Sequence, residues 1–247
     1  MYASDSFISP QLFNTLIDVH DQPPLQKSEL LELGAIFQKY KVMDKYMIGL
    51  LHKHYDLSQG KVAFTTDITP DISITKATAI SSIGDRSLRG QLYFLHNDEW
   101  QAYEYEDGPT EDFDPNFLRE LADRVRALDL EDRISLGSSK KSLGTREMLI
   151  APDATASFSS SSLGESWTSL DVEVLEVGWG FTESANGQGI TVLENYTGHA
   201  KSLTTGNHVV LYTSGCSGSA AGLLKQADLD NPRNVVELFQ KHGWLRG

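Results

Sequence analysis

The sequence predicts a single α+β domain in which an antiparallel sheet is flanked by N-terminal, middle and C-terminal helices. Apolar side chains recur at helical spacing near both ends and once in the middle of the chain. Between these segments, several runs alternate apolar and polar residues with a period of two, as half-buried strands do. The chain has 247 residues, and no linker separates two complete sets of elements, so one domain spanning residues 1–247 is expected.

Residues 1–45 are predicted to form the helical N-terminal part. Ser9 has the character of an N-cap, and Pro10 suits the first helical position because its ring fixes a helical φ. Pro23 ends this helix because proline cannot donate the backbone hydrogen bond that would continue it. Ser28 is expected to open a second helix.

Residues 46–230 are predicted to be mostly β, with one helix near residues 115–129. The clearest hairpin lies within residues 91–106, where two alternating runs flank a tight turn. A C-terminal helix is expected over residues 231–243, with a proline at its second position and a glycine at its end.

Residues 46–57 fit two structures. As a helix, they place Met47, Leu51 and His54 on one face. As a strand, they place His52 and His54 on one face instead, because successive strand residues point to opposite sides. The turn at residues 58–60, followed by a strand-like run, favours a hairpin and therefore the strand.

His52 and His54 are the candidate catalytic residues. On a strand, the two imidazoles project from the same face, where they can act as an acid–base pair or bind one divalent metal ion. On a helix they diverge and cannot share a ligand. The alternative is that both histidines are structural, at the end of an element or in the core.

A metal site needs a third ligand, and the sequence offers His96, His199, His208 and many carboxylates without a reason to choose among them. The established metal-binding motifs are absent: there is no H-E-x-x-H, no paired C-x-x-C and no EF-hand loop. From the sequence alone, a divalent metal ion is a candidate cofactor, and the sequence does not determine which residues would bind it.

The segment from Leu50 to Leu57 contains Leu51-His52-Lys53-His54-Tyr55. It resembles a group of uncharacterised filamentous-fungal proteins, in which a helix leads to a Leu-His-x-His-aromatic segment followed by β-rich sequence and a C-terminal helix. The resemblance implies a fungal origin and the strand conformation for the histidines. It implies no activity.

A third candidate is a serine hydrolase. The run Gly215-Cys216-Ser217-Gly218-Ser219 resembles the nucleophile loop of trypsin-like serine proteases, which would make Ser217 the nucleophile. The histidine motif of that family is missing, and the predicted helices do not suit its double barrel. The alternative is a Gly/Ser loop before the last helix.

Composition excludes several classes of function. Lys and Arg total 21 against 34 Asp and Glu, a net charge of −13, and no basic cluster is large enough for nucleic acid or an anionic membrane surface. No G-x-G-x-x-G or Walker motif indicates a nicotinamide, flavin or nucleotide cofactor. A single cysteine, no signal peptide and no spanning apolar stretch predict a cytoplasmic location without membrane contact.

The resulting prediction is a small cytosolic enzyme that acts on an organic small molecule. His52 and His54 would supply acid–base or metal-assisted chemistry of the lyase, isomerase or cyclase type, because such reactions need no redox or nucleotide cofactor. The alternative is a non-catalytic protein that binds a small molecule or a partner.

Overall fold

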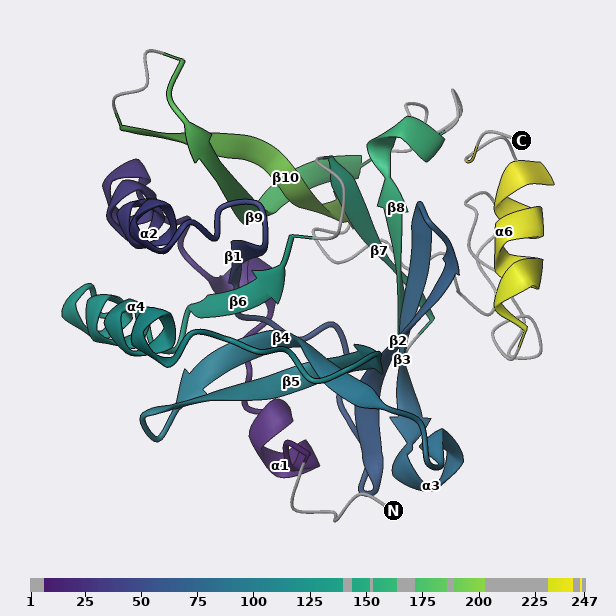
Figure 1. Ribbon diagram of the computed structural model, residues 1–247. Coiled ribbons are helices and arrows are strands. Elements are labelled where there is room, and N and C mark those ends of the chain that lie inside the picture. The colour runs from purple at the N-terminus through teal and green to yellow at the C-terminus, as the bar shows by residue number, and fades with distance from the viewer. Residues whose placement is uncertain are drawn as a thin grey trace.

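The chain folds into a closed ten-stranded β-barrel with helices on its outer surface (Figure 1). The computed structural model describes residues 7–139, 144–151, 153–163, 172–185, 189–202, 231–241 and 245. Around the barrel the strands follow the order β1-β6-β4-β5-β2-β3-β8-β7-β10-β9, and β9 closes the ring by pairing with β1.

The strands and helices have the following bounds. The strands are β1 (Tyr46–Leu50), β2 (Lys61–Thr69), β3 (Ile72–Ala79), β4 (Leu88–His96), β5 (Glu99–Asp107), β6 (Ile134–Ser138), β7 (Thr145–Ala151), β8 (Ala154–Ser159), β9 (Val172–Glu183) and β10 (Ile190–Ser202). The helices are α1 (Pro10–Phe13), α2 (Lys27–Tyr40), α3 (Ile80–Ile83), α4 (Pro115–Ala127) and α6 (Pro232–Lys241), with short 3-10 turns at η2 (Val19–Asp21) and η3 (Ser160–Ser162). None of these described helices has the length and apolar character needed to cross a bilayer.

The predicted α+β architecture, an antiparallel sheet flanked by helices, is wrong. The sheet has no free edge, because β1 pairs with β6 on one side and with β9 on the other. It is not wholly antiparallel either, since β2 pairs with β5 and β7 pairs with β10 in parallel. Period-two alternation shows that a strand has two unlike faces, but it does not show which strands pair or whether the sheet closes.

Buried polar side chains gather inside the barrel, and many apolar side chains face outward, as β8 illustrates. Ala156 and Phe158 face outward and pack against α6, where the rings of Phe158 and Phe239 lie 5.4 Å apart. The residues that alternate with them, Thr155 and Ser157, are also buried and face the interior. The helices therefore supply the apolar cover that the outer face of the sheet requires.

On another side of the barrel, α2 and α4 lie side by side over β1, β6 and β9 (Figure 1). The Phe37 and Phe117 rings meet edge to face at 5.3 Å, and Phe37 also contacts Phe181 of β9. Gly34 allows α2 to approach this closely, because a Cβ atom there would lie 2.7 Å from the Phe181 ring. This cluster forms the main apolar core.

The first helix is shorter than the sequence predicts. Ser9 caps it as expected, with its hydroxyl accepting a hydrogen bond from the Leu12 amide at 3.1 Å. The helix then ends at Phe13, well before Pro23. The second helix begins one residue earlier than predicted, because Gln26 and Glu29 form a capping box ahead of Ser28.

Residues 46–57 match neither predicted structure completely. Tyr46–Leu50 is strand β1, and the chain then continues without regular structure. Leu51, Tyr55 and Leu57 pack into a second apolar cluster that includes side chains of α1, β4 and β5. The two histidines therefore lie just beyond a strand end, on an irregular segment held by its apolar neighbours.

We expect Phe117→Ala to lower the free energy of unfolding by about 3–5 kcal/mol, because Phe117 is fully buried between α4, α2 and β1. Chemical denaturation followed by circular dichroism measures this. The matched control is Leu31→Ala on α2, where the side chain is 37% exposed and the expected change is within about 0.5 kcal/mol. Equal losses in the two variants would contradict this packing.

Candidate functional site

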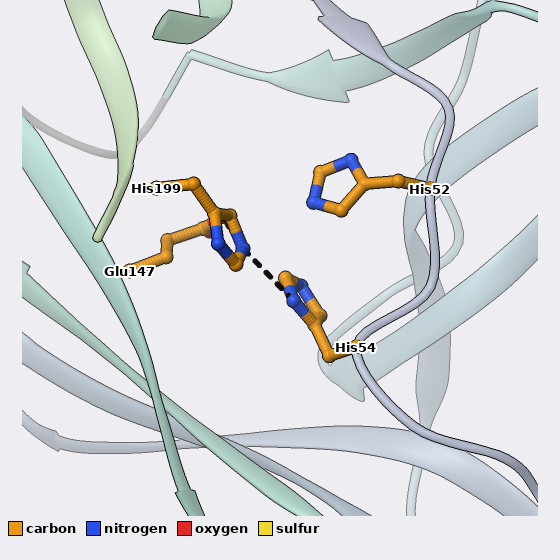
Figure 2. Close-up of side chains that lie close together, drawn as sticks. All are labelled: His52, His54, Glu147 and His199. Atoms are coloured by element: carbon orange, nitrogen blue, oxygen red, sulfur yellow. Dashed lines mark hydrogen bonds and ion pairs between the residues drawn. The ribbon is translucent and has the colours of Figure 1, made fainter. Parts of the chain in front are cut away.

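Four side chains converge inside the barrel from three separate parts of the chain (Figure 2). His52 and His54 come from the segment after β1, Glu147 from β7 and His199 from β10. One ligand atom from each residue lies within 4.8 Å of those of the other three. We call this group the His/Glu cluster.

The strand register explains why Glu147 and His199 meet. In the parallel pairing of β7 and β10 the two residues lie directly opposite each other, so their side chains project from the same face. That face is the barrel interior, where His199 is fully buried. The Glu147 carboxylate Oε2 lies 3.7 Å from the His199 Nε2.

The closest contact in the cluster joins two imidazoles. The His199 Nε2 lies 2.9 Å from the His54 Nδ1, and the two rings are nearly parallel. One of these nitrogens donates and the other accepts, because a hydrogen bond needs a single hydrogen between them. The contact ties together two residues that are 145 positions apart in the sequence.

A second carboxylate faces the other side of His54. Glu104 of β5 lies with its Oε1 atom 4.0 Å from the His54 Nε2, and both side chains are almost completely buried. Two carboxylates, Glu104 and Glu147, thus flank the imidazoles of His54 and His199. Buried carboxylates are costly unless positive charge compensates them, so this arrangement favours a positive charge at the cluster, such as that of a bound cation.

His52 is oriented by the backbone. Its Nδ1 lies 2.8 Å from the Leu50 carbonyl oxygen. A carbonyl oxygen only accepts hydrogen bonds, so Nδ1 carries the hydrogen, and in the neutral ring Nε2 carries the lone pair. Histidines that bind metals are held in the same way by an outer hydrogen bond. The His52 ring also meets the His54 and His199 rings edge to face, at 4.7 and 5.1 Å.

Two buried phenols show how strongly the surroundings of the cluster disfavour negative charge. Burial and, secondarily, the charge of Glu104 raise the pKa of Tyr55 and Tyr103 well above the ordinary value of 10.0. Both phenols therefore stay neutral at physiological pH. The same low polarity strengthens any interaction between a cation and the cluster.

The distances suit a first-row metal ion. At metal–ligand bonds of about 2.0–2.1 Å, neighbouring ligand atoms lie about 2.9–3.4 Å apart in octahedral or tetrahedral geometry. The His54–His199 distance of 2.9 Å falls in this range, and the His199–Glu147 distance of 3.7 Å lies just outside it. The longest distances, up to 4.8 Å, must shorten when an ion binds.

The structure brings together only some of the residues considered from the sequence. His52 and His54 share the cluster, and His199 joins them from among the three histidines proposed as a third ligand. His96 lies elsewhere, at the end of β4 beside Phe94. His208, Cys216 and Ser217 fall outside the described residues, so the hydrolase loop stays a prediction.

Sequence reasoning missed Glu147 and Glu104. Each is a single acidic residue in a strand, and neither has a spacing relative to the histidines that local geometry can interpret. Only the pairing of β7 with β10, and the position of β5 in the ring, bring them to the imidazoles. Their burial in otherwise regular strands is the one signal, and it exists only in the folded chain.

We expect the neutral His52 ring to be protonated on Nδ1, because the Leu50 carbonyl fixes that tautomer. Long-range ¹H–¹⁵N correlation spectra of the metal-free protein, recorded above the pKa of this ring, distinguish the two tautomers. His96 serves as the comparison within the same spectrum. Protonation of His52 on Nε2 would contradict the orientation described here.

Comparison with known proteins assigns no family to this chain. No protein-family model, curated protein sequence or solved structure matches it. The resemblance to the filamentous-fungal group therefore stays a prediction. The His/Glu cluster and its surroundings are the basis on which a function can be proposed.

Proposed function

We propose that the chain is an enzyme that binds one divalent transition-metal ion at the His/Glu cluster and acts on an organic small molecule inside the barrel. The observation that carries the proposal is the convergence of three imidazoles and one carboxylate on one buried point. Three strands or segments, distant in the sequence, contribute to this point, so adjacency in the chain does not explain it.

The ligand set indicates the class of metal. Imidazole nitrogens suit zinc, iron, nickel and copper, whereas magnesium and calcium prefer oxygen ligands. With three nitrogens to one carboxylate, the cluster favours a first-row transition metal. An ion of this kind would act as a Lewis acid that polarises a carbonyl or hydroxyl group of the substrate.

The chain's own residues would hold and move protons around the substrate. Glu104 positions His54 from the side away from His199, and the Leu50 carbonyl holds His52. Reactions that transfer protons, of the lyase, isomerase or cyclase type, need only these groups and a Lewis acid. The sequence predicts either acid–base or metal-assisted chemistry at His52 and His54, and of these two we favour the metal-assisted form.

A second candidate is a non-catalytic protein that binds a small molecule or a partner, with the histidines in a structural role. The hydrogen bond between His54 and His199 favours it, because this contact gives each of the two buried imidazoles a polar partner within the chain. In that case the cluster would be a buried polar network that fixes the irregular segment after β1 to the barrel wall.

We expect the purified chain, stripped with a chelator, to bind one divalent ion such as Zn²⁺ per chain. His199→Ala should weaken binding at least about 100-fold, because it removes a buried ligand from the centre of the cluster. Isothermal titration calorimetry and elemental analysis measure the affinity and the stoichiometry.

The matched control is His96→Ala, which removes an imidazole outside the cluster and should bind the metal ion as the unmodified chain does. His199→Gln keeps a polar side chain in case the alanine variant fails to fold. Unchanged affinity in a folded His199 variant would overturn the metal site.

The catalytic role is tested by the double variant His52→Ala/His54→Ala. We expect metal-loaded protein to convert a member of a small-molecule panel, monitored by NMR, and the double variant to lose that turnover. Full turnover by the folded double variant would rule out chemistry at the cluster. A metal-loaded chain that binds a small molecule and never converts it would establish the second candidate instead.

A further inference from the structure

A polar chamber of about 190 Å³ lies at the end of the barrel near the turn between β2 and β3, and it shares lining residues with a smaller cavity beside the His/Glu cluster. We propose that it binds a small uncharged polyhydroxylated molecule, a sugar or polyol, and presents it to the cluster. This inference rests on the proposed function, because it names the class of substrate for the same site. Five serine and threonine hydroxyls line the chamber: Ser73, Ser138, Thr145, Ser157 and Ser159.

The chamber and the cluster share a wall. Gln91 and Ser138 line the chamber and also a smaller cavity of about 30 Å³, which His52 and Glu147 line from the other side. Ser157 lines the chamber, and its hydroxyl donates to the Glu147 carboxylate at 3.4 Å. A molecule in the chamber therefore lies next to the cluster.

The strand register places these groups in one row. Glu147 on β7 is opposite Ser157 on β8, which is opposite Ser73 on β3. Because opposed residues of paired strands project from the same face, the row runs from the cluster along the chamber wall. Ser73 lies at the far end of this row, two strands away from Glu147.

The lining selects for a ligand with many hydroxyl groups. Each serine or threonine hydroxyl, like the Gln91 amide, both donates and accepts hydrogen bonds, and so does each hydroxyl of a polyol. Buried hydrogen-bonding groups of this kind discriminate strongly against ligands that leave them unpaired. Only Pro70 and Ile72 add apolar surface, and no aromatic ring is among the described residues around the chamber.

The charges disfavour an anionic ligand. Asp67, Asp71 and Glu106 face the chamber, against the single cation Arg89. The Arg89 Nε already donates to the Glu106 Oε1 at 2.7 Å, and its Nη1 lies 3.6 Å from a Glu111 oxygen. A phosphate or carboxylate would therefore meet uncompensated negative charge. Carboxylates are good acceptors for the hydroxyl groups of a neutral sugar.

The test uses the full metal-loaded chain and calorimetric or NMR titration with named probes. The uncharged probes are glycerol, xylitol and D-glucose, the anionic probe is gluconate and the cationic probe is glucosamine. We expect saturable binding of an uncharged probe and weaker binding of gluconate, whereas glucosamine should bind at least as well as glucose because the carboxylates of the chamber attract its ammonium group. Ser73→Val should weaken that binding at least about tenfold, because it replaces a chamber hydroxyl by a methyl group.

Two matched variants complete the test. Thr78→Val removes a hydroxyl from the outer face of the same strand, β3, and should leave polyol binding unchanged. Ser138→Val offers a second chamber variant if Ser73→Val fails to fold. Neither chamber variant should change the metal stoichiometry, because neither residue belongs to the His/Glu cluster.

The outcomes separate this inference from the proposed function. Metal binding without binding of any uncharged probe would overturn the polyol site and leave the metal site standing, and so would tighter binding of gluconate than of glucose. Loss of metal binding overturns the proposed function. Polyol binding that the folded chamber variants do not weaken would place the ligand elsewhere and overturn the inference.

Discussion

The burial of two carboxylates inside a closed barrel is the constraint on which the rest of this structure depends. Glu104 and Glu147 are both more than nine-tenths buried, and the imidazoles of His54 and His199 lie between them. Carboxylates at that depth require positive charge or strong hydrogen bonds nearby. The imidazoles lie where such a charge or a bound cation is needed, and the contact between His54 and His199 ties the segment after β1 to β10, two strands away around the ring.

This polar interior determines what the outside of the barrel must be. A strand has two faces, and here the inner face carries most of the buried hydroxyls, carboxylates and imidazoles together with a few apolar side chains such as Met47, while many apolar residues point outward. The outer face needs cover, and α6 packs on β3, β7 and β8 while α2 and α4 pack on β1, β6 and β9. The apolar cores therefore lie between the helices and the barrel, and the interior remains available for a polar ligand and a metal ion.

Much of the local structure is predictable from the sequence, because it depends on neighbouring residues. The hairpin within residues 91–106 is β4 and β5, and the proline-led helices are α4 and α6. Closure of the sheet is not predictable in this way. Alternating residues look the same in an open sheet and in a barrel, and the parallel pairings of β2 with β5 and β7 with β10 join strands that are distant in the sequence.

The same distinction applies to the site. His52 and His54 are recognisable because residues two apart share one side of a strand, and this geometry is local. The structure instead places them on an irregular segment just beyond β1, where both imidazoles still reach the cluster. His199 was one of three equivalent possibilities, and Glu147 gave no signal, because their meeting depends on the register of β7 with β10. Residues that converge through register rather than spacing become visible only once the fold is known.

The central claim, that one metal ion is held by all four residues of the His/Glu cluster, is tested most directly by anomalous diffraction. Crystals of the full chain loaded with a first-row metal, measured on both sides of its absorption edge, locate the ion independently of any interpretation of the protein density. The account predicts a single strong peak within bonding distance of His52, His54, Glu147 and His199. A metal-loaded crystal whose only peaks lie outside the barrel, or in which the His54–His199 hydrogen bond persists without an ion between the side chains, would contradict it.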